Sequence, residues 1–123
     1  MRLMKTPMGE ATITIPYDEK LVGDPETGVV HGGVVTTLLD TGCGIAAISR
    51  TGLMGGIATL DLRIDYMRPA KPGLSLTARC ECYRVTRSVA FARGFAYDDD
   101  PADPVATAAG AFMITGKPKA KSS

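Results

Sequence analysis

The segment from His31 to Ala47, HGGVVTTLLDTGCGIAA, limits the folds open to this chain more than any other stretch. Its residues are apolar, small or hydroxylated, except for His31 and a single carboxylate, Asp40. The stretch from about Gly33 to Ser49 is too long for an ordinary strand, and apolar residues recur along it at helical spacing, at Val34, Leu38, Ile45 and Ile48. Apolar residues also fill the other faces, which predicts a helix buried on nearly all sides. Gly52 predicts where this helix ends.

Alternation of apolar and polar residues predicts strands before and after the helix. The first spans Ala11–Tyr17, where Pro16 marks a sheet edge or the end of the strand. Four more follow the helix, at Thr59–Met67, Leu74–Val85, Ser88–Tyr97 and Pro104–Thr115. Their short connections suit antiparallel neighbours. The predicted fold class is therefore α+β, with an antiparallel sheet of about five or six strands wrapped around one long central helix.

The strand Thr59–Met67 shows the alternation most clearly. Its apolar side chains are expected to point inward, namely Leu60, Leu62, Ile64 and Tyr66. Its charged side chains are expected to point outward, namely Asp61, Arg63 and Asp65. The turn PAKPG then follows the strand.

The length of 123 residues predicts one domain over residues 1–123, with flexible tails at residues 1–10 and 116–123. The net charge of +1 argues against a nucleic-acid partner, which requires clustered basic residues. We see no signal peptide and no apolar run that approaches the roughly 20 residues of a membrane span, so we expect a cytoplasmic protein that does not bind membranes. Three cysteines without a C-x-x-C pair predict reduced, structural thiols. The single histidine argues against a histidine-based metal site within one subunit.

Two motif matches lack the context that would give them meaning. GCGIAA, at Gly42 to Ala47, fits a dinucleotide-binding pattern, but it lies in the middle of the predicted helix rather than at a strand-to-helix turn. We interpret Gly42 and Gly44 as positions where the sheet approaches the helix backbone closely. DDDPAD lacks the glycine and the terminal glutamate of a calcium loop. The signatures of serine hydrolases, zincins and P-loop proteins are also absent from the sequence.

The HGG motif stands where a loop becomes the predicted helix. Backbone N–H groups in the first turn of a helix have no partners within it, and glycines such as Gly32 and Gly33 allow a ligand to approach them. Such a helix start can stabilise a developing oxyanion. A glycine-rich helix entry capped by His31, with no catalytic role, explains the motif equally well.

Asp40 is the sharper signal, because a carboxylate in an apolar helix must find a partner or belong to a site. One interpretation is structural, with Thr36, Thr37 or a backbone group of another element as its partner. The other is functional, since a partly desolvated carboxylate is suited to act as a general base. Gly32 and Asp40 are separated by roughly 12 Å along a helix, so one chain cannot bring both to the same reacting carbon. If both are catalytic, two subunits must share the site.

Three segments together resemble the PaaI-like branch of the hotdog-fold acyl-CoA thioesterases: HGGVVTTLLD, TLDLRIDYMRPAKPG and VATAAGAFMI. The resemblance covers roughly residues 11 to 115. It implies a hotdog fold, in which a sheet wraps around one long helix, and dimers whose sheets join and often pair into tetramers. It also implies thioester hydrolysis without a metal or redox cofactor.

The resemblance assigns roles to particular residues. The backbone N–H of Gly32 would polarise the thioester carbonyl, while His31 and Gly33 shape the turn. Asp40 would act as nucleophile or as general base for water, and Thr59 would help to position the water or the acid. Gly33 and Val34 are expected to contact the substrate.

The phosphates of coenzyme A require cations at the mouth of the site, and the basic turns offer Arg68, Lys71, Arg84 and Arg87. Each of these is equally well explained as an ordinary solvated charge. Several relatives carry an asparagine about six residues before the histidine, where this chain has Pro25, and the chain contains no asparagine. Thr59, the backbone or the substrate must therefore position the water.

The expected function is hydrolysis of an acyl- or aryl-CoA thioester to a free acid and coenzyme A. The alternative is a non-catalytic hotdog protein that binds acyl-CoA as a sensor or scaffold. A dehydratase of the same fold is expected to use a catalytic histidine, and His31 in an HGG turn fits that role poorly.

Overall fold

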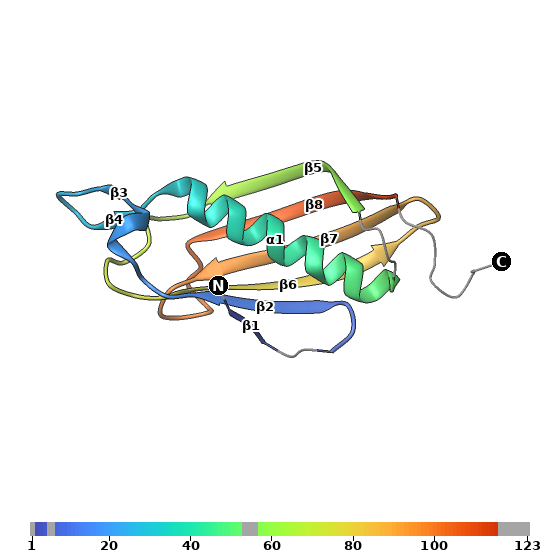
Figure 1. Ribbon diagram of the computed structural model, residues 1–123, viewed down its shortest axis with the longest axis horizontal. Helices are drawn as coiled ribbons and strands as arrows, with labels where there is room; N and C mark the ends of the chain where they lie inside the picture. The colour runs from blue at the N-terminus through green and yellow to red at the C-terminus, as the bar shows by residue number, and fades with distance from the viewer. Residues whose placement is uncertain (1, 5–6, 53–56, 116–123) are drawn as a thin grey trace.

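One long helix packs on one face of an antiparallel sheet in the computed structural model, which describes residues 2–4, 7–52 and 57–115 (Figure 1). The strands before the helix α1 (Gly32–Thr51) are β1 (Arg2–Met4), β2 (Glu10–Ile15), β3 (Val22–Asp24) and β4 (Val29–Val30), with a short 3-10 helix η1 (Glu19–Leu21) between β2 and β3. The strands after it are β5 (Ile57–Tyr66), β6 (Leu76–Val85), β7 (Val89–Tyr97) and β8 (Ala106–Ile114). The predicted fold class is confirmed, and each predicted strand has its counterpart.

The main sheet has six strands in the order β1-β2-β6-β7-β8-β5, so β1 and β5 form its edges. β2 ends at Ile15, directly before Pro16, which has no N–H for the ladder. Residues 1–10 were expected to form a flexible tail. Instead residues 2–4 form β1, which pairs with β2 and places Leu3 opposite Ile13. The expected tail at 116–123 lies outside the described residues.

Helix α1 begins and ends where its terminal residues predict. The His31 side chain accepts a hydrogen bond from the Gly33 N–H, and Gly52 adopts a left-handed conformation (φ 62°) while its N–H bonds to the Ile48 carbonyl. One face is buried against the sheet, through Val35, Leu38, Leu39, Gly42, Cys43, Ala46 and Ala47. The opposite face is open, since Thr37 is exposed and the exposed fraction of Ile48 is 39%. The predicted burial on nearly all sides is therefore wrong for the single chain.

The length and composition of α1 also meet the requirements for a membrane span, contrary to the expectation that no apolar run is long enough. The sequence does not show its twenty residues as one apolar run, because Thr36, Thr37 and Asp40 interrupt it. The packing of one helix face on the sheet is consistent with a core helix. A cytoplasmic location stays a prediction.

The edge strand β5 contains a register shift that the sequence pattern does not reveal. Thr59 pairs with Phe112 and Asp61 with Ala111 on β8, so Leu60 is an extra residue between them. As a result Leu60 is 51% exposed, and its predicted inward orientation is wrong. Leu62 and Ile64 pack on the core as predicted.

Close packing between helix and sheet depends on small residues. A Cβ added at Gly42 would lie 2.7 Å from the Sγ atom of Cys80, so β6 can approach the helix only because residue 42 is glycine. A Cβ at Gly44 would meet nothing nearer than 3.8 Å, so the same interpretation does not apply there. All three cysteines are free and buried, in agreement with the predicted structural thiols.

Candidate active site

Among the backbone N–H groups of residues 31–34, at the start of α1, that of Gly32 is free. The His31 N–H donates to the Leu21 carbonyl (2.8 Å), the Gly33 N–H to His31 Nδ1 (2.9 Å) and the Val34 N–H to the His31 carbonyl (3.0 Å). Within the part of the chain that the structure describes, the Gly32 N–H has no such partner. It also carries part of the positive end of the helix dipole. The donor expected from the HGG motif is therefore available to a ligand.

The carbonyl of Gly32 is held by two side chains that the sequence motifs do not mark as site residues. The Tyr66 hydroxyl donates to this carbonyl at 2.9 Å, and the Thr36 hydroxyl lies 3.3 Å from it. The two hydroxyl groups also form a short hydrogen bond with each other. Tyr66 was interpreted only as an inward-facing apolar residue, because strand periodicity does not say what a phenol hydroxyl contacts.

Asp40 lies in the middle of α1 and is partly buried. The hydroxyl of Thr59 on β5 donates to its Oδ1 atom at 3.3 Å, so the structure brings these two predicted site residues together. The hydroxyl of Thr36, one of the alternative structural partners, is instead bound near Gly32. Across residues 2–4, 7–52 and 57–115, no group of three or more acids, cysteines and histidines could hold a metal ion.

The two halves of the candidate site lie apart on the same chain. Gly32 is the first residue of α1 and Asp40 is in its third turn, which corresponds to roughly 12 Å along the helix axis. A carbonyl bound to the Gly32 N–H therefore lies beyond hydrogen-bonding reach of Asp40 on the same chain. The Gly32 donor and the Asp40–Thr59 pair of one chain are therefore two separate candidate half-sites.

Two hollows flank the start of α1. One, of about 470 Å³, is lined by His31, Gly33 and Val34 together with Lys20 of the 3-10 helix. The other, of about 380 Å³, is mainly apolar and includes Gly32, Tyr66, Val35 and Met67 in its lining. A larger hollow of about 690 Å³ is lined by Arg79 and Phe95, among others. Along β6 and β7 these side chains alternate with the buried residues that face α1. This hollow therefore lies on the face of the sheet that points away from α1.

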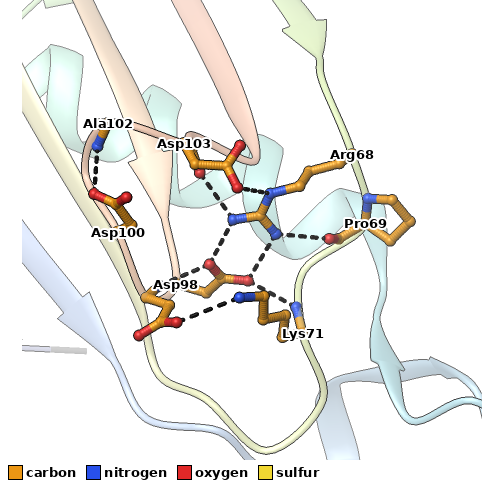
Figure 2. A network of polar contacts seen from close by, with 8 residues as sticks. Arg68, Pro69, Lys71, Asp98, Asp100, Ala102 and Asp103 are labelled. Carbon is orange, nitrogen blue, oxygen red and sulfur yellow. Dashed lines mark hydrogen bonds and ion pairs between the residues drawn. The ribbon is translucent and has the colours of Figure 1, made fainter.

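Arg68, one of the predicted phosphate-binding cations, is held inside the chain (Figure 2). Its guanidinium group forms two hydrogen bonds with Asp98, at 2.6 and 2.9 Å, and an ion pair of 3.2 Å with Asp103. The Asp98 side chain is fully buried and also accepts the backbone N–H of Lys71 at 2.7 Å. The hydrogen bonds from Arg68 hold the pKa of the Asp98 carboxyl well below its usual range. Arg68 therefore joins two turns instead of facing solvent as an unpaired charge.

The other predicted cations lie at two ends of the sheet. Lys71 is exposed beside Arg68 and forms an ion pair of 3.3 Å with Asp99. Arg84 is in β6 and Arg87 follows in the turn to β7, and β6 contacts the end of α1 through the Arg50 side chain, which donates to the Cys82 carbonyl (3.0 Å). Arg84 and Arg87 are both exposed, and neither has an ion-pair partner among the residues that the structure covers. Of the four predicted cations, Arg68 lines the same hollow as Gly32, whereas Lys71, Arg84 and Arg87 are not part of that lining.

The sequence profile of the thioesterase superfamily matches residues 27–105 of the chain, which include both half-sites. Among solved structures, a Pseudomonas aeruginosa protein is 48% identical and superposes with a TM-score of 0.82, over 92% of this chain and 84% of that one. A mutant of the phenylacetic acid degradation protein PaaI from Thermus thermophilus is 25% identical, with a TM-score of 0.78, over 91% of this chain and 90% of that one. These matches confirm the resemblance given by the three motifs.

Two curated proteins are similar over parts of their length. A putative esterase of Halobacterium salinarum is 44% identical over 69 residues, which are 54% of this chain and 46% of that protein. The medium/long-chain acyl-CoA thioesterase YigI of Escherichia coli is 27% identical over 117 residues, which cover 85% of this chain and 74% of that protein. The chain thus matches about half of the length of the first relative and three quarters of the second.

Proposed function

Because the chain belongs to the thioesterase superfamily, we propose that it hydrolyses an acyl- or aryl-CoA thioester to a free acid and coenzyme A. The similarity to YigI, a medium/long-chain acyl-CoA thioesterase, supports coenzyme A as the thiol part of the substrate. In this reaction water adds its oxygen to the carbonyl carbon, the C–S bond breaks, and the sulfur leaves as the thiol.

The free N–H of Gly32 is the observation that carries this proposal. The N–H groups of His31, Gly33 and Val34 are bound to acceptors of Leu21 and His31, whereas that of Gly32 is left as a donor at the positive end of a helix. A thioester carbonyl bound there is polarised, and the negative charge that forms on its oxygen during attack is stabilised. Such preorganised donors typically account for a factor of about 10² to 10³ in kcat.

Asp40 supplies the second chemical group. The hydroxyl of Thr59 engages Oδ1, which fixes the carboxylate and leaves its other oxygen for chemistry. Asp40 then either takes a proton from the attacking water or attacks the carbonyl itself to form an anhydride that water opens. Both routes end in the same products.

The complete site requires a second copy of the chain. The Gly32 N–H of one subunit and the Asp40 carboxylate of the other act on one carbonyl carbon, and two-fold symmetry produces two equivalent sites. The edge strand β5 supports this arrangement, because it pairs with β8 on one side only and presents an unpaired backbone on the other. We therefore propose a homodimer, or a tetramer of two such dimers, in which the two sheets join through β5.

Charge complementarity favours one register for this pairing. On the outer face of β5, Arg63 stands between Asp61 and Asp65. An antiparallel pairing centred on Leu62 places Arg63 opposite the partner subunit's Asp61, whereas moving the centre of the pairing to Asp61 or to Arg63 would place like charges opposite each other. The same register sets Tyr66, at the Gly32 end of the strand, close to the partner subunit's Thr59.

The proposal is tested by following thiol release from a panel of acyl- and aryl-CoA substrates with the wild-type protein and Asp40→Ala. We expect the wild type to release thiol and the variant to remain a folded oligomer with most of its turnover lost. Binding of acyl-CoA without any thiol release would favour the sensor or scaffold alternative. Unchanged turnover in Asp40→Ala would show that the carboxylate has been assigned wrongly.

A further inference from the structure

Tyr66 is the last residue of β5 and reaches from the sheet edge to the start of α1. Its ring is about half exposed, but its hydroxyl is engaged by both the Gly32 carbonyl and the Thr36 hydroxyl. No other side chain that the structure describes joins β5 to the Gly32 backbone by a hydrogen bond. The contact is therefore specific to the residue that carries the free donor.

The three oxygens of this cluster share two hydroxyl protons. The Gly32 carbonyl can only accept, so two of the three contacts can be hydrogen bonds at one time. The Tyr66 hydroxyl lies closer to the carbonyl, at 2.9 Å, than the Thr36 hydroxyl does, at 3.3 Å. The favoured arrangement is that Thr36 donates to Tyr66 and Tyr66 donates to Gly32. Polarisation along such a chain strengthens the bond to the carbonyl.

Gly32 needs external support because glycine has the greatest backbone freedom of any residue. The peptide group before it is held at the His31 carbonyl by the Val34 N–H. The peptide group after it is held at the Gly33 N–H by His31 Nδ1 and at the Gly32 carbonyl by Tyr66. Both peptide planes around the Gly32 Cα atom are therefore fixed, and with them the direction of its N–H.

We propose that Tyr66 is a positioning residue: it holds the Gly32–Gly33 peptide group, limits rotation about the Gly32 Cα atom, and so keeps the N–H of the preceding peptide group aimed at the thioester carbonyl. This inference rests on the proposed thioester hydrolysis and adds a role for β5. The same strand anchors both half-sites, since Thr59 holds Asp40 and Tyr66 holds Gly32. Pairing of two β5 strands then fixes the donor of one subunit relative to the carboxylate of the other.

The chain offers a matched control for the test. The hydroxyl of Tyr17 also donates to a glycine carbonyl, that of Gly28, at the same distance of 2.9 Å. Tyr66→Phe and Tyr17→Phe therefore remove the same kind of hydrogen bond. We expect Tyr66→Phe to lower kcat about tenfold with little change in KM, and Tyr17→Phe to leave both unchanged. Equal kcat values for the two variants would overturn the proposal.

A second measurement does not depend on activity. In ¹⁵N relaxation experiments on the dimer, we expect the order parameter of the Gly32 N–H to fall in Tyr66→Phe and to stay at the wild-type value in Tyr17→Phe. An unchanged order parameter would overturn the positioning role even if kcat falls, because Tyr66 would then act on the substrate directly. If the wild type hydrolyses no acyl-CoA, the proposed function fails. The relaxation result then decides separately whether Tyr66 fixes the donor.

Discussion

The hydroxyl of Thr59 donates a hydrogen bond to Asp40 across 3.3 Å, joining the edge strand β5 to the middle of α1. This contact depends on the register shift at Leu60, which lets Thr59 and Leu62 both face the helix although they are three positions apart. In an uninterrupted strand these two side chains would point to opposite sides of the sheet.

Removal of the Thr59 hydroxyl tests whether the contact orients the carboxylate. We expect Thr59→Val to lower kcat by roughly 10- to 100-fold, because a hydrogen bond to a charged group contributes about 1.5–3 kcal/mol. Thr59→Ser keeps the hydroxyl and is expected to retain most of the activity. Steady-state kinetics on one acyl-CoA substrate make the comparison, and similar kcat values for the two variants would contradict the role of the hydroxyl.

The Gly32 donor can be deleted without placing a bulky group in the site. Proline lacks an N–H and is favoured at the first position of a helix, where Gly32 stands, and His31 before it already has the extended conformation that proline requires (φ −58°, ψ 136°). We expect Gly32→Pro to lower kcat by about 10² to 10³. Gly32→Ala keeps the N–H, and its Cβ would lie 3.8 Å from the nearest atom, the Tyr66 hydroxyl. It should therefore remain active, and an equal loss in both variants would argue against the donor.

Two helical glycines should respond to alanine in opposite directions. In Gly42→Ala the new Cβ would lie 2.7 Å from the buried Sγ of Cys80, and the same sulfur lies 2.5 Å from where a Cβ of residue 94 would be, so it packs closely on Gly94 as well. We expect the free energy of unfolding to fall by about 1–3 kcal/mol. Gly44→Ala meets only an ordinary contact, so it should gain up to about 1 kcal/mol from helix propensity. Urea unfolding at fixed protomer concentration compares the two, and equal stabilities would refute the packing account.

The buried carboxylate of Asp98 should make stability depend on acid pH. Its pKa is lower in the folded than in the unfolded chain, so the unfolded chain binds more protons in acid. The stabilisation from Asp98 is therefore complete above the unfolded value, near pH 4, and is lost as the pH falls toward the folded value. Asp98→Asn should cost about 3 kcal/mol at pH 7, and its deficit relative to wild type should shrink below pH 4. A deficit that stays constant with pH would contradict this.

Periodicity in the sequence was sufficient to predict α1 and the strands, because each buries one apolar face whose spacing identifies the element. The residues of the two candidate half-sites could also be predicted from the sequence, because HGG marks a helix start with unpaired donors and Asp40 is the one acid among apolar neighbours. Both features are local, and local patterns are what a single sequence reports.

The shift at Leu60 could not be predicted, since TLDLRIDY alternates without interruption through the extra residue. The hold of Tyr66 on Gly32 and the pair of Arg68 with Asp98 were missed for a related reason. Each joins residues about thirty positions apart, and sheet topology alone brings them together. In the sequence alone, Arg68 therefore resembles a free surface cation, because the turn that carries Asp98 is distant along the chain.

The most direct test of a shared site uses mixed dimers of Gly32→Pro and Asp40→Ala subunits, purified through two different affinity tags. In such a dimer one site combines the intact Gly32 of one subunit with the intact Asp40 of the other, and the second site lacks both groups. We expect each variant alone to be nearly inactive and the mixed dimer to recover about half of the wild-type kcat per dimer. A mixed dimer no more active than its two parents would show that each chain contains its own site and would contradict the central claim.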